Sequence, residues 1–167
     1  MKTLPIWMPT VQDFLHESVW IEEAAATIGT EMIEQLAMDA RDIRTNSYAP
    51  YSKYHVGVAI LTTSGKVYTG VNAERASYSE TDHAEESAIT SAIIGGEIAR
   101  SGRRFIKAVA VSHAGTSAPC GRCRQIIAEH ADNALIVLAD PDAHIHSITS
   151  LKSILPLAFT PTDLGIE

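Results

Sequence analysis

The stretch VGVAILTTSGKVYTGV, residues 56–71, decides the fold of this chain. A run of β-branched and apolar residues over 56–61 is followed by Thr63-Ser64-Gly65, which is typical of a tight turn. A second such run follows over 67–71. Two strand-like runs separated by a short turn predict a β-hairpin, so we expect these residues to form the first two strands of a sheet.

Beyond this hairpin, strand-like segments alternate with helix-like segments. Residues 106–111 and 135–139 predict buried strands, while residues 84–94 and 121–130 predict helices. Towards the C-terminus, a short strand or turn is expected around Ile148 and a helix over 151–155. A hairpin followed by alternating strands and helices is typical of a mixed sheet covered on both faces. We therefore predict an α/β fold, a three-layer α/β/α sandwich with a mixed five-stranded sheet.

Two helical patterns precede the hairpin. Apolar residues over 33–43 recur with the i, i+3, i+4, i+7 spacing of one helix face. An earlier helix is expected over 10–28, ended by Gly29, with an apolar stripe of Val11, Phe14, Leu15 and Val19. We expect residues 1–30 to form an N-terminal helical extension and residues 31–167 to form the domain that carries the chemistry described next.

Charge and composition narrow the range of partners. The 167 residues suffice for one compact domain, and 20 acidic against 13 basic residues leave a net charge of −7. Such a chain repels a long polyanion, and we interpret its basic cluster (Arg100, Arg103, Arg104 and Lys107) as a solvated loop. No apolar run approaches the roughly 20 residues that span a bilayer, and no signal-like segment is found. We expect no nucleic-acid polymer, no membrane and a cytoplasmic location.

Two short segments carry the chemistry, His83-Ala84-Glu85 and Pro119-Cys120-Gly121-Arg122-Cys123. Each opens a predicted helix, where unpaired amides and the helix dipole favour anions and therefore thiolates. One imidazole and two thiolates leave the fourth position of a tetrahedral zinc open to water, which is the geometry of a catalytic site. Glu85 is close enough in sequence to reach that water without being a ligand. His-x-Glu followed by Pro-Cys-x-x-Cys is typical of zinc deaminases, in which the glutamate moves protons.

The sequence resembles the cytidine deaminase family in four blocks over about residues 31–165. These blocks are Ala49-Pro50-Tyr51-Ser52-Lys53-Tyr54-His55-Val56-Gly57, Thr69-Gly70-Val71-Asn72-Ala73-Glu74-Arg75-Ala76-Ser77-Tyr78, Pro119-Cys120-Gly121-Arg122-Cys123-Arg124-Gln125 and Leu155-Pro156-Leu157-Ala158-Phe159-Thr160-Pro161-Thr162-Asp163-Leu164. The resemblance implies one zinc ion per subunit, held by His83, Cys120 and Cys123, and Glu85 as the catalytic proton shuttle.

The resemblance also implies a substrate site for a small-molecule nucleoside. Asn72 and Glu74 match residues that bind the ribose 3′-hydroxyl, and Tyr54 stands where the family usually has a Phe that packs on the pyrimidine. The backbone around Ala84 would receive the base carbonyl. Tyr78 and Phe159 match residues that reach the site across a subunit interface, which implies a homotetramer. Phe159 fits equally well as a core anchor.

Several features depart from the family pattern. Arg75 stands where asparagine is usual, and Ser79-Glu80-Thr81-Asp82 places two additional acids in the segment before His83. These acids would lie near the base and favour a cationic or N4-substituted substrate. Residues 1–30 are expected to have no counterpart in the family. The other histidines, which lack a ligand-like spacing to the cysteines, are expected at the surface or as caps: His55, His113, His130, His144 and His146.

The favoured function is zinc-dependent hydrolytic deamination of cytidine and deoxycytidine to uridine and deoxyuridine in pyrimidine salvage. A deaminase of a modified cytosine nucleoside is the main alternative, because the block Cys120-Gly121-Arg122-Cys123-Arg124-Gln125 also resembles blasticidin S deaminase. A non-catalytic zinc-binding module needs neither Glu85 nor the Asn72-x-Glu74 pair. A polynucleotide-editing deaminase would need a basic strip, and a thioredoxin-like oxidoreductase would place its Cys-x-x-Cys after the first strand.

Overall fold

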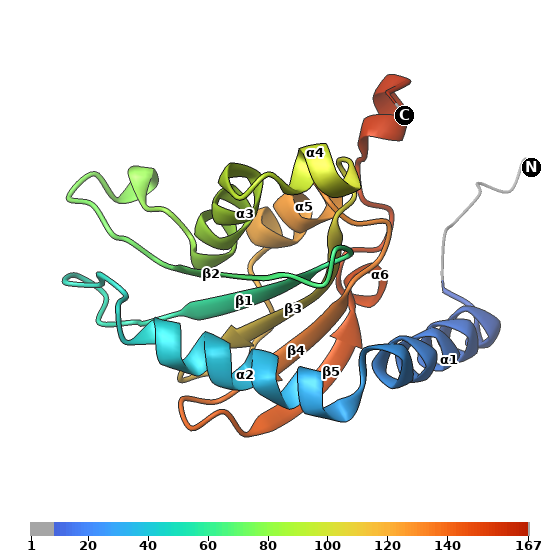
Figure 1. The fold of residues 1–167 in the computed structure, drawn as a ribbon, viewed down its shortest axis with the longest axis horizontal. Helices are drawn as coiled ribbons and strands as arrows, with labels where there is room; N and C mark the ends of the chain where they lie inside the picture. The colour runs from blue at the N-terminus through green and yellow to red at the C-terminus, as the bar shows by residue number, and fades with distance from the viewer. Residues whose placement is uncertain (1–8, 167) are drawn as a thin grey trace, which may run out of the picture.

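A mixed five-stranded sheet forms the middle layer of the computed structural model, which describes residues 9–166 (Figure 1). The strand order is β2-β1-β3-β4-β5. Only the β3–β4 pair is parallel among these strands; the others are antiparallel. The bounds are β1 Gly57–Thr62, β2 Val67–Val71, β3 Ile106–Ser112, β4 Leu135–Ala139 and β5 Ile145–Ser150. The predicted hairpin and the predicted mixed sheet are confirmed.

Helices cover both faces of the sheet (Figure 1). On one face lies α2 (Thr30–Arg44), and α1 (Val11–Ile28) packs beside it and reaches β4 and β5. On the other face lie α3 (Ala84–Ile94) and α5 (Gly121–Glu129). Shorter elements complete the structure: η1 Tyr78–Glu80, α4 Glu97–Ser101, α6 Leu151–Ile154 and η2 Pro161–Leu164. The three-layer α/β/α sandwich is therefore confirmed. None of the helices in the described range is long and apolar enough to cross a bilayer.

The central strands are buried along their whole length because both of their faces meet helices. In β1, Val58 and Ile60 join the core on the α3 and α5 side, whereas Ala59 and Leu61 join the core on the α2 side. Complete burial of each Ile or Leu contributes about 1.5–3 kcal/mol. The unbroken apolar runs of the sequence thus correspond to strands in the middle layer.

Two glycines allow helices to lie unusually close to the sheet. A Cβ on Gly57 would be 2.1 Å from the Ala40 carbonyl oxygen in α2. A Cβ on Gly70 would be 2.2 Å from the Ala88 nitrogen and 2.5 Å from the Ala84 oxygen in α3. Since no side chain fits there, Gly70 brings β2 against the first turns of α3, which is the helix that carries His83 and Glu85 at its start.

The N-terminal helix exists as predicted, but its apolar stripe does not face the core. Thr10 and Asp13 form a capping box at its start, and Gly29 ends it. The helix packs through the partly buried Trp20, Ile21, Ala24, Ala25 and Ile28. The stripe of Val11, Phe14, Leu15 and Val19 is exposed. Residues 1–8 of the predicted extension lie outside the described residues.

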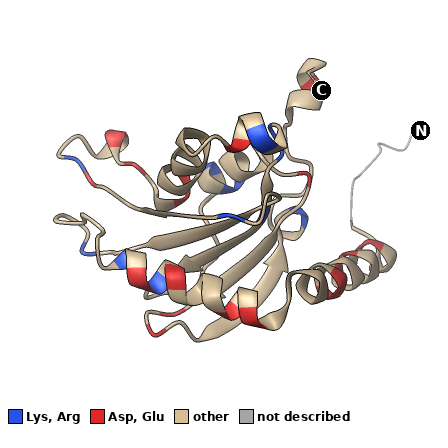
Figure 2. Ribbon diagram, viewed as in Figure 1, with Lys and Arg blue, Asp and Glu red and all other residues tan. Residues whose placement is uncertain are grey.

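The interpretation of the basic cluster as a solvated loop is correct only in part, because Arg103 and Arg104 lie in the connection between α4 and β3 whereas the other two residues lie in regular elements. Arg100 lies in α4 and pairs with the buried Glu97, Lys107 lies in β3, and Arg104 pairs with Asp132 at 2.9 Å. Sequence periodicity missed α4 because its five residues are too few to show a helical repeat. Across the described residues, Lys and Arg are scattered and form no continuous basic strip (Figure 2).

Candidate active site

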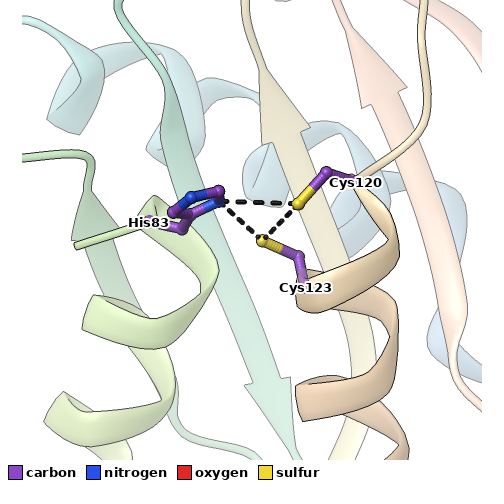
Figure 3. A group of neighbouring side chains, drawn as sticks. All are labelled: His83, Cys120 and Cys123. Atoms are coloured by element: carbon purple, nitrogen blue, oxygen red, sulfur yellow. Dashed lines mark hydrogen bonds between the residues drawn. The ribbon is translucent and has the colours of Figure 1, made fainter. Parts of the chain in front are cut away.

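Three predicted metal ligands meet where two helices begin (Figure 3). His83 is the N-cap residue of α3, Cys120 is the N-cap residue of α5, and Cys123 lies in the first turn of α5. The His83 Nδ1 atom is 3.2 Å from the Cys123 sulfur and 3.5 Å from the Cys120 sulfur. The two sulfur atoms are 3.5 Å apart, so both cysteines are free thiols rather than a disulfide.

This donor set fits zinc. Bonds of about 2.0 Å to nitrogen and about 2.3 Å to sulfur in a tetrahedron separate ligand atoms by roughly 3.5–3.8 Å. The observed separations of 3.2–3.5 Å are close to that range. Burial raises the pKa of the Cys123 thiol, and the neighbouring Glu85 carboxylate raises it further. Burial and Glu85 thus oppose a thiolate at Cys123, and a bound cation would offset that opposition.

Charged groups beside the cluster are paired with each other. The Glu86 carboxylate lies 2.7 Å from the Arg122 guanidinium and also accepts a hydrogen bond from the His83 backbone N–H at 3.2 Å. The Glu86 carboxylate raises the pKa of Arg122. This pair links the first turn of α3 to the first turn of α5, and Arg122 neutralises the acid that follows Glu85.

The strand register places further polar residues around the same opening. Gly57 is opposite both Val71 and Ser112, so residues just before β1, just after β2 and just after β3 lie at one edge of the sheet. A cavity of about 340 Å³ opens there, a size within the range of small-molecule sites. Among its lining residues are the metal cluster, Glu85 and five of the predicted substrate residues: Tyr54, Asn72, Glu74, Tyr78 and Ala84.

Known proteins resemble this chain in sequence and in fold. Residues 30–139 match the family described as the cytidine and deoxycytidylate deaminase zinc-binding region. The chain is 37% identical over 136 residues to a cytidine deaminase of Sporosarcina psychrophila, which covers 80% of this chain and 95% of the relative. The crystal structure of cytidine deaminase from Burkholderia pseudomallei matches with a TM-score of 0.66 and 37% identity, covering 75% of this chain and 97% of that one.

This chain belongs to the cytidine and deoxycytidylate deaminase family. A cytidine deaminase of Vibrio cholerae serotype O1 is 33% identical over 168 residues, which covers 92% of this chain and 52% of the relative. A match over 92% of the chain is too long to fit within residues 31–167. The match therefore extends into the first thirty residues, and the expectation that they have no counterpart in the family is wrong.

In this deaminase, Asn72 and Glu74 already have partners within the chain. The Asn72 side chain accepts from the Val56 N–H at 2.9 Å and donates to the Tyr54 carbonyl at 2.8 Å. The Glu74 carboxylate accepts from the backbone N–H groups of Tyr51 and Ser52 at 2.8 and 3.1 Å. The Ser52 hydroxyl is the main cause that lowers the pKa of Glu74. Both residues therefore hold the segment before β1 in place as well as lining the cavity.

Two residues that depart from the family pattern, Arg75 and Asp82, form an ion pair with each other. Arg75 lies 2.7 Å from Asp82 and donates to the Ala73 and Glu80 carbonyl oxygens. The cavity lining includes Thr81 but neither Glu80 nor Asp82. The expectation that these two acids lie near the base is therefore wrong, because one is paired with Arg75 and the other is exposed.

Phe159 lies apart from the cavity of its own chain. Its side chain is 59% exposed, so the interpretation as a core anchor is wrong. Its carbonyl oxygen accepts a hydrogen bond from Gln125 of α5 at 2.5 Å, and Arg124 fixes the preceding segment by donating to the Ile154 carbonyl at 2.8 Å. Tyr78, by contrast, lines the cavity of its own chain.

His113 is the site residue that the sequence reasoning missed. It was expected at the surface or as a cap, but it is only 5% exposed and lines the cavity directly after β3. It contacts the Tyr54 hydroxyl, the Gly115 N–H and the Ser117 carbonyl. Its position could have been a signal, because sites gather at the carboxyl ends of parallel strands and β3 pairs in parallel with β4.

Proposed function

We propose that this chain catalyses the hydrolytic deamination of cytidine and deoxycytidine, giving uridine or deoxyuridine and ammonia. The observation that carries the proposal is the cluster of His83, Cys120 and Cys123 in the wall of a small-molecule cavity, with the carboxylate of Glu85 beside it. Family membership supports the same reaction, because the relatives compared above are named cytidine deaminases. The reaction belongs to pyrimidine salvage, and we place it in the cytoplasm.

The chemistry divides between the bound metal and Glu85. Zinc held by the three side chains would lower the pKa of a bound water towards neutrality. The Glu85 carboxylate would take one proton from this water, which adds to C4 of the base, and deliver it to ring N3. Glu85 would then take the second proton from the hydroxyl now on C4 and deliver it to the amino group, so that the C4–N bond breaks and ammonia leaves. Glu85 is only 5% exposed, which protects these transfers from bulk solvent.

Residues of the cavity hold the nucleoside. The Tyr54 ring packs on the pyrimidine, and the backbone at Ala84 receives the base carbonyl. Asn72 and Glu74 bind the ribose 3′-hydroxyl with the hydrogen-bonding capacity that their internal contacts leave. Because its hydrogen bonds hold the pKa of Glu74 below its usual value, that carboxylate is ionised at neutral pH and accepts from a hydroxyl.

The assembly proposed here is a homotetramer with sites completed across subunits. The exposed Phe159 side chain, whose backbone is fixed by Gln125, supports a role in a neighbouring subunit's site rather than in its own. Tyr78, which the resemblance also assigns to a subunit interface, lines the cavity of its own chain. Residues 1–30 are proposed as an extension of the catalytic domain, in agreement with the start of the family match at residue 30.

Turnover by the zinc-loaded protein tests this function. We would offer cytidine, deoxycytidine, an N4-substituted cytidine and blasticidin S in parallel and follow the ultraviolet absorbance, with zinc content and mass in solution measured on the same sample. We expect turnover of cytidine and deoxycytidine, one zinc per chain and a tetrameric mass. Turnover of only a modified substrate would overturn the substrate assignment, and no turnover with full zinc content would favour a non-catalytic module.

A further inference from the structure

The buried His113 and the partly exposed Tyr54 form a pair at the cavity, from the segments that follow β3 and precede β1. The Tyr54 hydroxyl oxygen is 2.7 Å from His113 Nδ1, and the ring centroids are 5.6 Å apart. We infer that His113 is a positioning residue, which sets the Tyr54 ring against the substrate base through a hydrogen bond of fixed direction. This inference rests on the proposed function, in which Tyr54 packs on the pyrimidine.

The neighbours of His113 determine where its proton lies. Nε2 is 2.9 Å from the Ser117 carbonyl oxygen, which can only accept, so Nε2 carries the hydrogen. The Gly115 backbone N–H points to Nδ1 at 2.9 Å, so Nδ1 is the unprotonated acceptor. A neutral imidazole with this tautomer satisfies both backbone groups at the same time.

The tautomer in turn determines the orientation of the Tyr54 hydroxyl. Since Nδ1 has no hydrogen, the Tyr54 hydroxyl is the donor, and it shares the single lone pair of Nδ1 with the Gly115 N–H in a three-centre hydrogen bond. The turn at Gly115 closes around this contact, because a Cβ there would be 3.0 Å from the Tyr54 hydroxyl and 3.3 Å from the His113 ring. Phenylalanine, which is usual at position 54 in the family, could not make this bond.

The pair connects two walls of the cavity. One wall is the segment before β1 that carries Tyr54, and the other is the segment from His113 to Cys120. The position of the ring relative to the zinc ligands therefore depends on the bond. A misplaced Tyr54 ring weakens the binding of the substrate and of the transition state by the same amount. Loss of the hydrogen bond to His113 therefore raises KM and leaves kcat nearly unchanged.

Steady-state kinetics of variants at both positions test this inference. Tyr54→Phe and His113→Ala should each raise KM for cytidine by about 3- to 10-fold, the value of one neutral hydrogen bond, with kcat within about threefold. The double variant should be no worse than the more affected single variant, because both remove the same bond. His113→Asn should restore KM towards the wild-type value, since its Oδ1 atom can accept where Nδ1 does. His130→Asn, at a histidine outside the cavity lining, is the matched control.

Several outcomes would overturn the inference: additive effects in the double variant, no rescue by His113→Asn, a loss of bound zinc, or a fold-decrease in kcat as large as the fold-increase in KM. Nitrogen NMR of ¹⁵N-histidine-labelled full-length protein tests the pair independently of turnover. We expect His113 as the Nε2–H tautomer, with an Nδ1 resonance that shifts in Tyr54→Phe. The opposite tautomer would overturn the pair, whereas an inactive wild-type enzyme with the expected tautomer would overturn only the proposed function.

Discussion

Among the described residues, two clusters have the composition of a metal site, but only one also has the burial and the cavity of such a site. In each, three potential ligand atoms lie within 4.8 Å of one another: His83, Cys120 and Cys123 in the first, and Asp140, Asp142 and His144 in the second. The first cluster lines a cavity and contains a buried cysteine. The second lies in the exposed connection between β4 and β5.

The hydrogen bonds of the second cluster explain the difference. One Asp140 oxygen accepts from the backbone N–H groups of Asp142 and His144 at 2.8 and 2.9 Å, and the other lies 3.1 Å from the His144 ring. These contacts are those of an aspartate that stabilises its own turn. In the first cluster, the ligand atoms face one another and two helix starts bring them together from distant parts of the chain. Proximity of ligands is therefore not enough to identify a metal site; burial and a cavity are needed.

The most direct test of the difference between the two clusters is to remove one potential ligand from each and to ask which variant loses zinc. Cys123→Ala should lose stoichiometric zinc and lower turnover by at least about a thousandfold, because the activated water is lost with the metal. Asp140→Ala should keep both zinc content and turnover. Metal analysis and the cytidine assay measure the two effects. Equal loss of zinc from both variants would show that the second cluster is also a site.

A second test asks whether the first cluster has the catalytic neighbour that the second lacks. Glu85→Gln should keep zinc while turnover falls by about 10²- to 10⁴-fold, because an amide cannot move the protons. Glu86→Gln is the matched control, since the adjacent acid pairs with Arg122 and should change turnover only slightly. Substantial activity in Glu85→Gln would contradict the proton-shuttle assignment.

A third test concerns the scaffold that brings the first cluster together. Gly70→Ala would place a Cβ 2.2 Å from the Ala88 nitrogen of α3, and backbone cannot yield as a flexible side chain can. We expect a loss of at least about 2 kcal/mol in the free energy of unfolding and weaker zinc binding. Gly121→Ala, at a position with no atom within 4 Å, should be near neutral. Denaturant unfolding compares them, and equal stabilities would refute the close-approach argument.

The smallest expected effect is a change in the pH dependence of stability that is due to Asp140 of the second cluster. Burial alone would raise the pKa of Asp140, but hydrogen bonds from His144 and Asp142 outweigh burial and lower it. A lowered pKa in the folded state means that the contribution to stability is present above about pH 4 and is lost as the pH falls further. The unfolding midpoints of wild type and Asp140→Asn should therefore differ slightly at pH 7 and converge below pH 4. A difference that grew on acidification would contradict this sign.

Much of the fold was accessible from the sequence because its signals are local. The hairpin over 56–71, the apolar runs of β3 and β4, and Gly29 at the end of α1 each act within a few residues, and each prediction is confirmed. The apolar stripe of α1 was read correctly as helical, but its spacing did not show that it lies at the exposed surface of the chain. Periodicity reports the conformation of a segment, whereas its neighbours depend on how the whole chain packs.

In the candidate site too, some features could be predicted from the sequence and others could be seen only in the tertiary structure. The sequence by itself identified His83, Cys120 and Cys123 as a set of zinc donors, because these ligand types at the starts of two helices restrict the metal. Only the tertiary structure decided that Arg75 neutralises Asp82 and that His113 is buried against Tyr54. Those contacts join residues whose spacing along the chain carries no recognisable pattern. Strand register and helix packing bring them together, and neither is encoded within a single segment.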